Sequence, residues 1–278
     1  MDKNALAMVD EAISGDRSSP LCKHFHDWSI EEYAALYLTD LSGFSHLASA
    51  LPKMPSREIQ RRYTWWEGEE LMKQSVDFIK YVKSSYERLI GRPLKDAVAL
   101  DYGAGWGRLT RMLLQFIPDE RVHACDAWAS TVDLFNELGF RLRCDLIAPV
   151  PQSLPYNADQ FDLAFLFSIL THLPEESANA VLQSLHRIVK PDGLVVVTIR
   201  PFVFWRENPL AKNAGADPEK MVNEHLERGF AHLPHKSAAN WGDTSISIDY
   251  FALHWPQWRI LGTEDNWTHQ VKILLQKN

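Results

Sequence analysis

The stretch from Val98 to Leu114, VALDYGAGWGRLTRMLL, constrains the fold of this chain more than any other. An apolar run ends on Asp101, and glycines follow at positions 103, 105 and 107. Apolar residues then recur at helical spacing, at Leu109, Met112, Leu113 and Phe116. This pattern predicts a strand, a tight glycine loop and a helix, an arrangement that presents backbone N–H groups to an anionic ligand group. Glycine suits such a loop because it adopts positive φ and lets the backbone approach a ligand closely.

The spacing of the glycines separates classes of nucleotide-binding loop. The dinucleotide fingerprint GxGxxG requires glycine at position 108, where this chain has Arg108, so the spacing argues against NAD or FAD. No GxxxxGK[ST] motif is found, which disfavours a phosphate-cradling loop. A second short strand, RVHACD, ends in Asp126, near the distance of about 20 residues at which a ribose-binding acid is expected.

Two further motifs follow in order, FDLAFLFSILTHLP and IVKPDGLVVVTIRP. In their order and spacing, the four motifs closely resemble the class I S-adenosylmethionine-dependent methyltransferases, over roughly residues 95 to 200. The resemblance implies an α/β, Rossmann-like fold with a mostly parallel seven-stranded sheet and a C-terminal antiparallel β-hairpin. It also implies S-adenosylmethionine as the cofactor and methyl transfer as the reaction.

Strand and helix patterns alternate through the second half of the chain, which favours a mostly parallel sheet covered on both faces. We expect strands near residues 96–101, 121–126, 140–144, 161–167 and 194–199. A helix is expected from Glu175 to Val189, with Pro174 at its first turn and its stop at Pro191 and Gly193. A short helix, IDYFALHW, and strands at 258–262 and 269–276 fit the closing hairpin.

Residues 1–95 are expected to form a helical N-terminal cap, and residues 96–278 the core. Ser29 and Glu32 make a capping-box pattern, and apolar residues from Leu71 to Leu89 predict a long amphipathic helix that ends at Gly91. Within the core, residues 200–244 show no convincing sheet pattern and are rich in aromatic residues and histidine. Such an interruption predicts a lid or substrate-binding insertion.

The composition of the chain indicates which classes of binding partner to expect. Hydrophobic residues make up 46% of the chain, and the net charge is −7 without a cluster of Lys and Arg, so a nucleic-acid partner is not expected. No apolar run approaches the roughly 18 residues of a membrane span, and the N-terminus lacks the pattern of a signal peptide. The three cysteines form no CxxC motif, so we expect them to be reduced in a cytoplasmic protein. The oligomeric state cannot be read from the sequence.

The resemblance implies a role for each part of the cofactor site. The amides of Gly103 to Gly107 and the following helix N-terminus suit the carboxylate of the cofactor, and Asp101 suits its ammonium group. Asp126 can accept two hydrogen bonds from the ribose hydroxyls. Trp128 is placed to pack on adenine, and Asp145 to accept from the adenine amino group. The full predicted set is Asp101, Tyr102, Gly103, Ala104, Gly105, Gly107, Asp126, Ala127, Trp128, Asp145, Phe167 and Ser168.

Aromatic residues outside the motifs are candidates for acceptor binding. The segment QRRYTWWEG suggests a gate over the ligands, although simple docking of the cap onto the core is the alternative. This segment and NWGDTSISIDYFALHW resemble a bacterial group of methyltransferases linked to sugar or surface-glycan modification. We therefore expect a small-molecule or glycan-like acceptor that is methylated on oxygen or nitrogen. The predicted acceptor-binding residues are Tyr63, Trp65, Trp66, Arg200, Trp205 and Trp241.

Three histidines are candidates for the base that a hydroxyl acceptor needs. His172, in SILTHLP, resembles the position of a catalytic histidine in phosphoethanolamine methyltransferases, although packing or turn geometry is the alternative role. His232 and His235 in the insertion are rival bases.

Metal binding and two other functional classes are alternatives to the methyltransferase interpretation. The groups His24, His26, Asp27 and His232, His235, Asp243 could chelate, but no HExxH motif, paired CxxC or carboxylate cluster supports a site, so no metal is predicted. A non-catalytic cofactor-binding or interaction protein is the first alternative to the enzyme. A nucleotide-dependent oxidoreductase is the second, weakened by Arg108.

Overall fold

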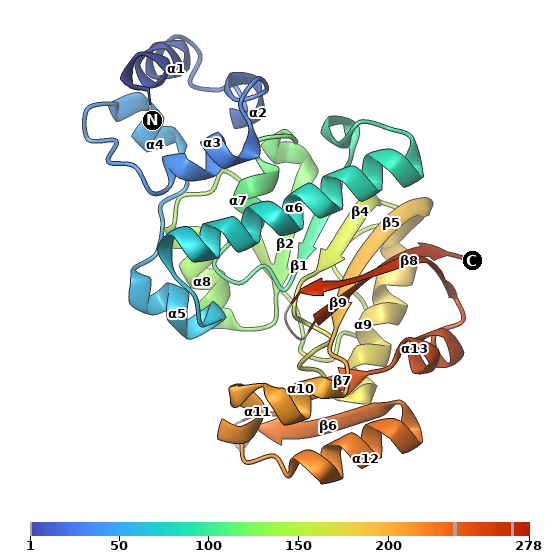
Figure 1. Ribbon diagram of the computed structural model, residues 1–278. Helices are drawn as coiled ribbons and strands as arrows, with labels where there is room; N and C mark the ends of the chain where they lie inside the picture. Colours follow the sequence, from blue (N-terminus) through green and yellow to red (C-terminus); the bar gives the residue numbers. More distant parts are fainter. Residues whose placement is uncertain (1, 236–237, 268–269) are drawn as a thin grey trace. The chain divides into compact units, whose positions relative to one another are not determined.

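The computed structural model describes residues 2–235, 238–267 and 270–278 (Figure 1). As predicted, the fold is α/β, with a seven-stranded sheet in the order β3-β2-β1-β4-β5-β9-β8. The pairs β1–β2, β2–β3 and β4–β5 are parallel. The last two strands form an antiparallel hairpin, and β9 is also antiparallel to β5. This is the Rossmann-like arrangement expected of the core.

The chain divides into two compact units, Met1–Leu146 and Ile147–Asn278. The first unit contributes three strands, β1 (Ala99–Tyr102), β2 (Val122–Asp126) and β3 (Cys144–Leu146). The second contributes the other four, β4 (Phe161–Leu166), β5 (Val189–Ile199), β8 (Trp258–Trp267) and β9 (Gln270–Lys277). The predicted boundary at residue 95 lies inside the first unit, so a separate helical cap of residues 1–95 stays a prediction.

The N-terminal part of the first unit is helical, as expected. Its helices are α1 (Lys3–Gly15), α2 (Leu21–His24), α3 (Ile30–Leu36), α4 (Ser45–Ala50), α5 (Arg57–Thr64) and α6 (Gly68–Ile90). The capping box of Ser29 and Glu32 is present at the start of α3. The predicted amphipathic helix is α6, which buries its apolar stripe from Leu71 to Tyr86 and ends at Gly91 with φ of 71°. A glycine ends the helix there because this left-handed conformation strains a residue with a Cβ.

The helix predicted after the glycine loop is much shorter than expected. Only Thr110–Leu113 forms a helix, α7, and turns flank it on both sides. The apolar residues that suggested a longer helix, Leu109, Met112 and Leu113, are all buried in the first unit. The spacing of these apolar residues therefore reflects the burial of one face of a segment that consists mostly of turns. The next helix of this unit is α8 (Ala129–Glu137).

The second unit contains the predicted helix and closing hairpin. Helix α9 runs from Glu175 to Ile188 with Pro174 as its N-cap residue, and α13 spans Ile248–His254. Strand β5 begins at Val189, earlier than expected, because the chain stays extended through Pro191 and Gly193. A register shift in β4, between Phe161 and Leu163, accommodates this extension.

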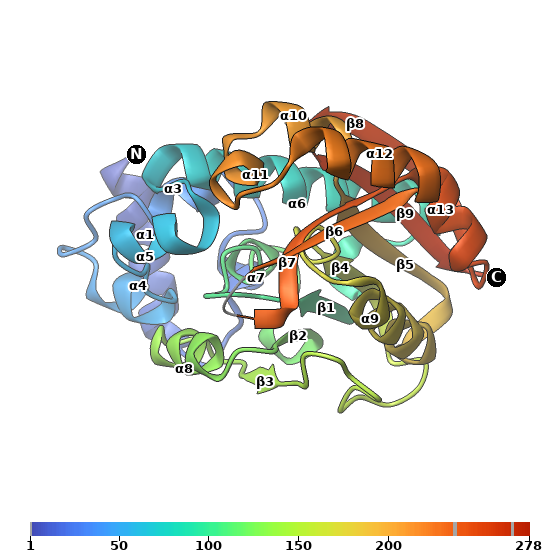
Figure 2. The same cartoon turned by 90° about the horizontal axis from the view of Figure 1, so that it is seen from below.

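Residues 200–244 contain a hairpin that the sequence did not indicate. Helices α10 (Val203–Glu207), α11 (Pro209–Asn213) and α12 (Pro218–Arg228) precede β6 (Phe230–His235) and β7 (Ala238–Ile246), which pair as a two-stranded sheet. Helix α12 runs along β6 (Figure 2). Histidines and a proline stand in β6, and a glycine and an aspartate in β7, so the usual strand pattern is hidden. The segment has its own core, formed by Phe204, Trp205, Ala211, Met221, Val222 and Ala231.

All three cysteines are free, and Cys125 and Cys144 are buried as expected for strand residues. Among the described residues, none of the helices is long and apolar enough to cross a membrane.

Candidate functional site

Asp126 is the last residue of β2, and its carboxylate is held by backbone amides. The amide of Gly105 donates to Oδ2 and the amide of Trp128 donates to Oδ1, each at 3.0 Å. Burial raises the pKa of Asp126, although these amides and that of Ala127 act in the opposite direction. A carboxylate has about four lone-pair positions, so the Asp126 carboxylate can still accept from a ligand beside these three amides.

The glycine loop adopts a conformation that explains its composition. Gly103, Gly105 and Gly107 all have positive φ, of 74°, 57° and 81°. A Cβ at Gly107 would lie 2.4 Å from the ring of Phe140, whereas at Gly105 it would meet only the Tyr63 ring, at 3.8 Å. Glycine at 107 is therefore required by packing and conformation together, and glycine at 105 by conformation alone.

The use of the loop amides differs from the prediction. The amides of Gly103 and Ala104 donate to Cys125 O at 2.8 and 3.1 Å, and that of Gly107 donates to Ala104 O at 2.9 Å. The amide of Gly105 binds Asp126. These four amides shape the loop, so they do not present a set of donors to a ligand carboxylate. Helix α7 is a single turn, so the predicted helix N-terminus is also absent there.

Asp101, near the end of β1, is a buried carboxyl group. It accepts a hydrogen bond of 2.6 Å from the hydroxyl of Thr110, a partner that the sequence did not identify. Burial raises the pKa of Asp101 to about 7, although Thr110 and the charge of Arg108 act in the opposite direction. An ammonium group beside this carboxyl would favour its ionised form.

Two arginines fix the glycine loop to the N-terminal helices. Arg108, which stands where a dinucleotide loop has glycine, is buried and donates to Gln74 and Ser75 of α6. Arg111 is fully buried, donates to Gly107 O at 3.2 Å and to Pro52 O at 3.2 Å, and lies against the Trp106 ring. Sequence analysis missed the role of Arg111, because its partners are backbone carbonyls and rings.

The aromatic segment after α5 lies partly at the surface. Tyr63 donates to or accepts from the hydroxyl of Thr131 at 3.0 Å, which connects α5 with α8. Trp65 has a positive φ of 66° and its residue is 68% exposed, while Trp66 and Trp128 are about half exposed. A tryptophan rarely adopts this backbone conformation, and such strain occurs at ligand-binding sites.

Three of the remaining predicted cofactor residues lie in or directly after strands of the sheet. Asp145 is the middle residue of β3 and pairs with Cys125. Phe167 and Ser168 follow β4 in the second unit. Ser168 has φ of 59°, and its amide donates to the Thr198 hydroxyl at 2.7 Å. The Ser168 hydroxyl accepts from Gln270 Nε2 at 3.0 Å.

Two predicted acceptor-binding residues are buried and paired inside the second unit. Arg200 is 4% exposed and forms an ion pair of 2.6 Å with Asp243 Oδ1. Trp205 is fully buried in the core of residues 204–231, and its indole N–H donates to Ser245 Oγ at 2.7 Å. Neither side chain has a surface for direct contact with an acceptor, which corrects the prediction for both.

His172 is held on both ring nitrogens. Nδ1 lies 2.7 Å from Gly242 O, and Nε2 lies 3.3 Å from Nη2 of Arg200. The ring stacks on Trp241 at 4.5 Å between centroids. Burial, with the charge of Arg200, holds the pKa of His172 well below its usual range.

The other two candidate histidines lie on the β6–β7 hairpin. His232 Nδ1 is 2.8 Å from the hydroxyl of Thr244, and its Nε2 is buried without a hydrogen-bond partner among the described residues. His235 Nε2 lies 3.1 Å from Asp243 Oδ2. Asp243 and Thr244 belong to the WGDT segment of the sequence, but their pairing with these histidines depends on the hairpin register.

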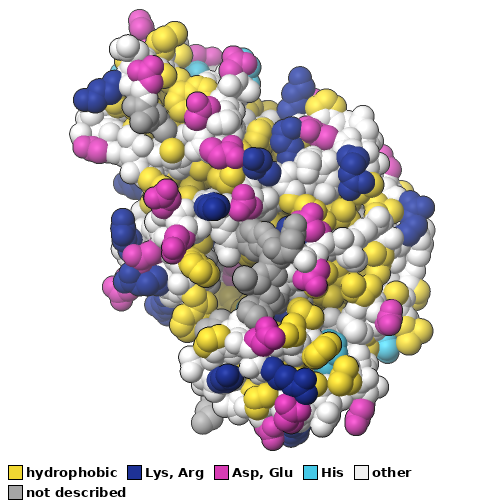
Figure 3. Space-filling view, in the orientation of Figure 1, with side chains coloured by type: hydrophobic (Ala, Val, Ile, Leu, Met, Phe, Trp, Pro, Cys, Tyr) yellow, Lys and Arg dark blue, Asp and Glu magenta, His cyan; other side chains and the backbone are white. Residues whose placement is uncertain are grey.

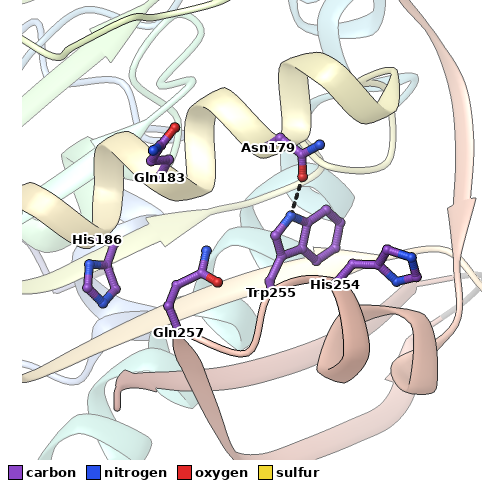
Figure 4. Close-up of a pocket in the computed structure, with 6 residues that line it drawn as sticks. All are labelled: Asn179, Gln183, His186, His254, Trp255 and Gln257. Atoms are coloured by element: carbon purple, nitrogen blue, oxygen red, sulfur yellow. Dashed lines mark hydrogen bonds between the residues drawn. The ribbon is translucent and has the colours of Figure 1, made fainter.

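Neither the surface charges nor the described pocket extends the set of candidate site residues. On the face shown in Figure 3, Lys and Arg side chains are interspersed with Asp and Glu. Among the described residues, no group of three or more His, Cys, Asp or Glu is arranged to hold a metal ion. A pocket of about 440 Å³ in the second unit lies between α9 and the end of α13 (Figure 4), but none of the predicted site residues lines it. Its lining is Asn179, Gln183, His186, His254, Trp255 and Gln257.

Comparisons with known proteins agree with this geometry. Residues 99–193 match the model of a family described as a methyltransferase domain. The matching part includes β1 with the glycine loop, Asp126 and the strands β4 and β5. No curated protein sequence is significantly similar to the chain.

Solved structures share the fold of the methyltransferase domain. The chain is similar to 1,6-didemethyltoxoflavin-N1-methyltransferase from Burkholderia thailandensis, with a TM-score of 0.52 and 18% identity over 90% of each chain. It is also similar to magnesium protoporphyrin IX methyltransferase from Synechocystis PCC 6803, with a TM-score of 0.49 and 15% identity. That match covers 80% of this chain and 94% of the other. At such identities, the likeness concerns the fold.

Proposed function

We propose that the protein is an S-adenosylmethionine-dependent methyltransferase that acts on a small-molecule or glycan-like acceptor. The observation that carries the proposal is the juxtaposition of Asp126 with the glycine loop at the ends of β1 and β2, inside a methyltransferase domain. S-adenosylmethionine supplies a methyl group activated by a positively charged sulfur. The Burkholderia enzyme named above was crystallised with S-adenosylhomocysteine, which supports the same cofactor here.

The residues of the first unit fit this cofactor. Asp126 would accept from the ribose hydroxyls through the lone-pair positions that the backbone amides around it leave. Asp101 would pair with the ammonium group, which would offset the cost of burying an ionised carboxyl. Trp128 would pack on the adenine and Asp145 would accept from its amino group. The positive φ values of the loop glycines allow the backbone to approach the ligand closely.

The aromatic residues support a small-molecule acceptor. Exposed Trp65 and Trp66, with Tyr63, would contact the acceptor through their ring faces. The Burkholderia relative was crystallised with bound 1,6-didemethyltoxoflavin, which is consistent with a small-molecule acceptor. The narrower assignment to sugar or glycan modification, and a cytoplasmic location, stay predictions.

Two experiments test the proposal. Mass spectrometry of ligands released from the purified protein should detect S-adenosylhomocysteine or S-adenosylmethionine. Incubation with S-adenosylmethionine and pooled hydroxyl- and amine-bearing small molecules should then form S-adenosylhomocysteine together with a methylated product. Tight binding of S-adenosylmethionine without product from any pool would favour the non-catalytic alternative, and a bound dinucleotide would favour the oxidoreductase.

A further inference from the structure

The carboxyl group of Asp101 is enclosed within the first unit, where the side chain of Thr110 holds it. Asp101 is 2% exposed, and Thr110 is fully buried. The hydroxyl of Thr110 lies 2.6 Å from Oδ2 of Asp101. An ionised carboxylate can only accept, so the hydroxyl donates its proton to the ionised form of Asp101. Hydrogen bonds to a charged acceptor are short and roughly twice as strong as those between neutral groups.

This hydrogen bond fixes the orientation of the Asp101 carboxylate. Because Oδ2 is held by the hydroxyl, rotation about the bond between Cβ and Cγ is restricted, and the direction of Oδ1 is fixed as well. A ligand cation that reaches Asp101 therefore meets a group that is already ordered. Less conformational entropy is lost when such a group binds, which increases affinity.

The glycine loop brings the two side chains together. Asp101 lies in β1 and Thr110 begins α7, nine positions later in the chain. The chain returns toward β1 between them, through Gly103, Gly105 and Gly107, all of which have positive φ. The loop therefore has a role besides the one proposed for its backbone, since its conformation makes the hydrogen bond between residues 101 and 110 possible.

The charges around Asp101 come from the loop and from the neighbouring strands. The charge of Arg108 favours the ionised carboxylate, and the charge of Asp126, at the end of β2, disfavours it. Asp101 also interacts with the thiols of Cys125 and Cys144, and burial raises the pKa of both thiols, so they are neutral near pH 7. Burial of Asp101 has the largest effect and raises its pKa to about 7. The two forms of Asp101 are thus nearly balanced at neutral pH, and the loss of one hydrogen-bond donor changes that balance.

We propose that Thr110 is the positioning residue of Asp101 for the ammonium group of S-adenosylmethionine. Its hydroxyl orients the carboxylate and stabilises the ionised form that an ion pair with the ammonium group requires. The inference rests on the proposed function and adds a residue that acts on the amino-acid end of the cofactor through Asp101. Removal of the hydroxyl should therefore weaken only those ligands that carry the ammonium group.

The first test needs no cofactor. Carbon-13 labelling of the aspartate carboxyl groups in the full chain follows their ionisation in a pH titration, and Asp101→Asn identifies the signal of Asp101. Thr110→Val replaces the hydroxyl by a methyl group of similar size, so the pKa of Asp101 should rise by about 1–2 pH units. Thr110→Ser keeps the hydroxyl and should restore a pKa close to that of the wild type. An unchanged pKa in a folded Thr110→Val protein would overturn the proposal.

The second test measures binding by calorimetric titration. At pH 6, Thr110→Val should bind S-adenosylhomocysteine roughly 10–100-fold more weakly than the wild type, because Asp101 must first lose a more tightly held proton. The difference should shrink as the pH rises and Asp101 ionises in both proteins. The affinity for 5′-methylthioadenosine, which has the adenosine part but no ammonium group, should be the same in both. Equal losses for the two ligands would overturn the proposal, since Thr110 would then act on the loop as a whole.

Two further variants serve as controls. Thr39→Val removes a hydroxyl that donates to Ala35 O at 2.7 Å near the end of α3, and it should change neither the pKa of Asp101 nor the affinity for S-adenosylhomocysteine. Thr110→Val combined with Asp101→Asn should bind no more weakly than Asp101→Asn alone, because the carboxylate through which Thr110 acts is absent. A further loss as large as that in the wild-type background would contradict the role of Thr110.

The outcomes separate this proposal from the proposed function. If the wild-type protein does not bind S-adenosylhomocysteine, the methyltransferase itself is contradicted. If the wild type binds it and Thr110→Val binds it equally well at pH 6, only the role of Thr110 is contradicted.

Discussion

At the scale of the residue, Asp101 combines burial with an expected role toward a cation. Its pKa in the folded protein, about 7, lies above that of an unfolded aspartate. The folded protein therefore binds the proton more tightly, and the contribution of Asp101 to stability falls as the pH rises from about 4 to about 7. A bound ammonium group would reverse this preference, because it favours the ionised carboxylate.

The affinity for S-adenosylhomocysteine should consequently depend on pH. Below pH 7, Asp101 must lose its proton before it can pair with the ammonium group, so affinity should fall by up to about tenfold per pH unit. Calorimetric titrations between pH 5.5 and pH 8 measure this dependence. In Asp101→Asn, affinity should be weaker and its dependence on pH shallower. The same slope in both proteins would contradict the assignment of Asp101.

At the scale of the element, two glycines of the loop differ in what requires them, because Gly105 is required by conformation alone and Gly107 by conformation and packing together. Gly105→Ala places a Cβ at ordinary contact distance from the Tyr63 ring, at positive φ, so its cost should be the conformational strain of about 1–2 kcal/mol. Gly107→Ala adds a clash with the rings of Phe140 and Phe135, and overpacking typically costs a further 1–3 kcal/mol. Urea unfolding of both variants should show the larger loss for Gly107→Ala. Equal losses would contradict the packing described for the loop.

The β6–β7 hairpin makes a second prediction at this scale. Thr244→Val removes the hydroxyl that donates to Leu173 O and accepts from His232, which leaves two polar groups unpaired. The expected loss of stability is about 1–3 kcal/mol. Thr244→Ser keeps the hydroxyl and should lose much less. Thermal melting of the two variants tests the pairing, which would be contradicted if both melted like the wild type.

The sequence predicted those helices whose identifying residues lie close together along the chain. The capping box of α3, the apolar stripe of α6 and the proline before α9 were each sufficient to place a helix. The β6–β7 hairpin was missed because its polar residues pair with one another only after folding. The role of the loop amides was predicted incorrectly, since their acceptors, Cys125 and Asp126, are decided by tertiary contacts.

At the scale of the whole molecule, the chain combines an acidic balance with free cysteines and a segment, residues 99–193, that matches a methyltransferase family model. The net charge is −7, and Figure 3 shows mixed signs on the face it presents. The described residues hold no ligand set of three or more side chains for a metal ion.

Methyl transfer should accordingly persist after treatment with EDTA. Because the proposed roles are filled by carboxylates, loop backbone and aromatic rings, removal of divalent cations should leave the rate of S-adenosylhomocysteine formation unchanged. The measurement compares chelated and untreated enzyme with the same acceptor. Loss of turnover that one specific divalent ion restores would contradict this prediction.

The central claim is that the first unit binds S-adenosylmethionine through Asp126 and the glycine loop. Titration calorimetry with S-adenosylhomocysteine tests it most directly on the wild type, on Asp126→Ala and on the control Asp133→Ala, whose aspartate is exposed on α8. The account predicts one site per chain in the wild type and in the control. It predicts a loss of about 1.5–3 kcal/mol of binding free energy in Asp126→Ala, since charged hydrogen bonds are removed. Unchanged affinity in a folded Asp126→Ala protein would contradict the account.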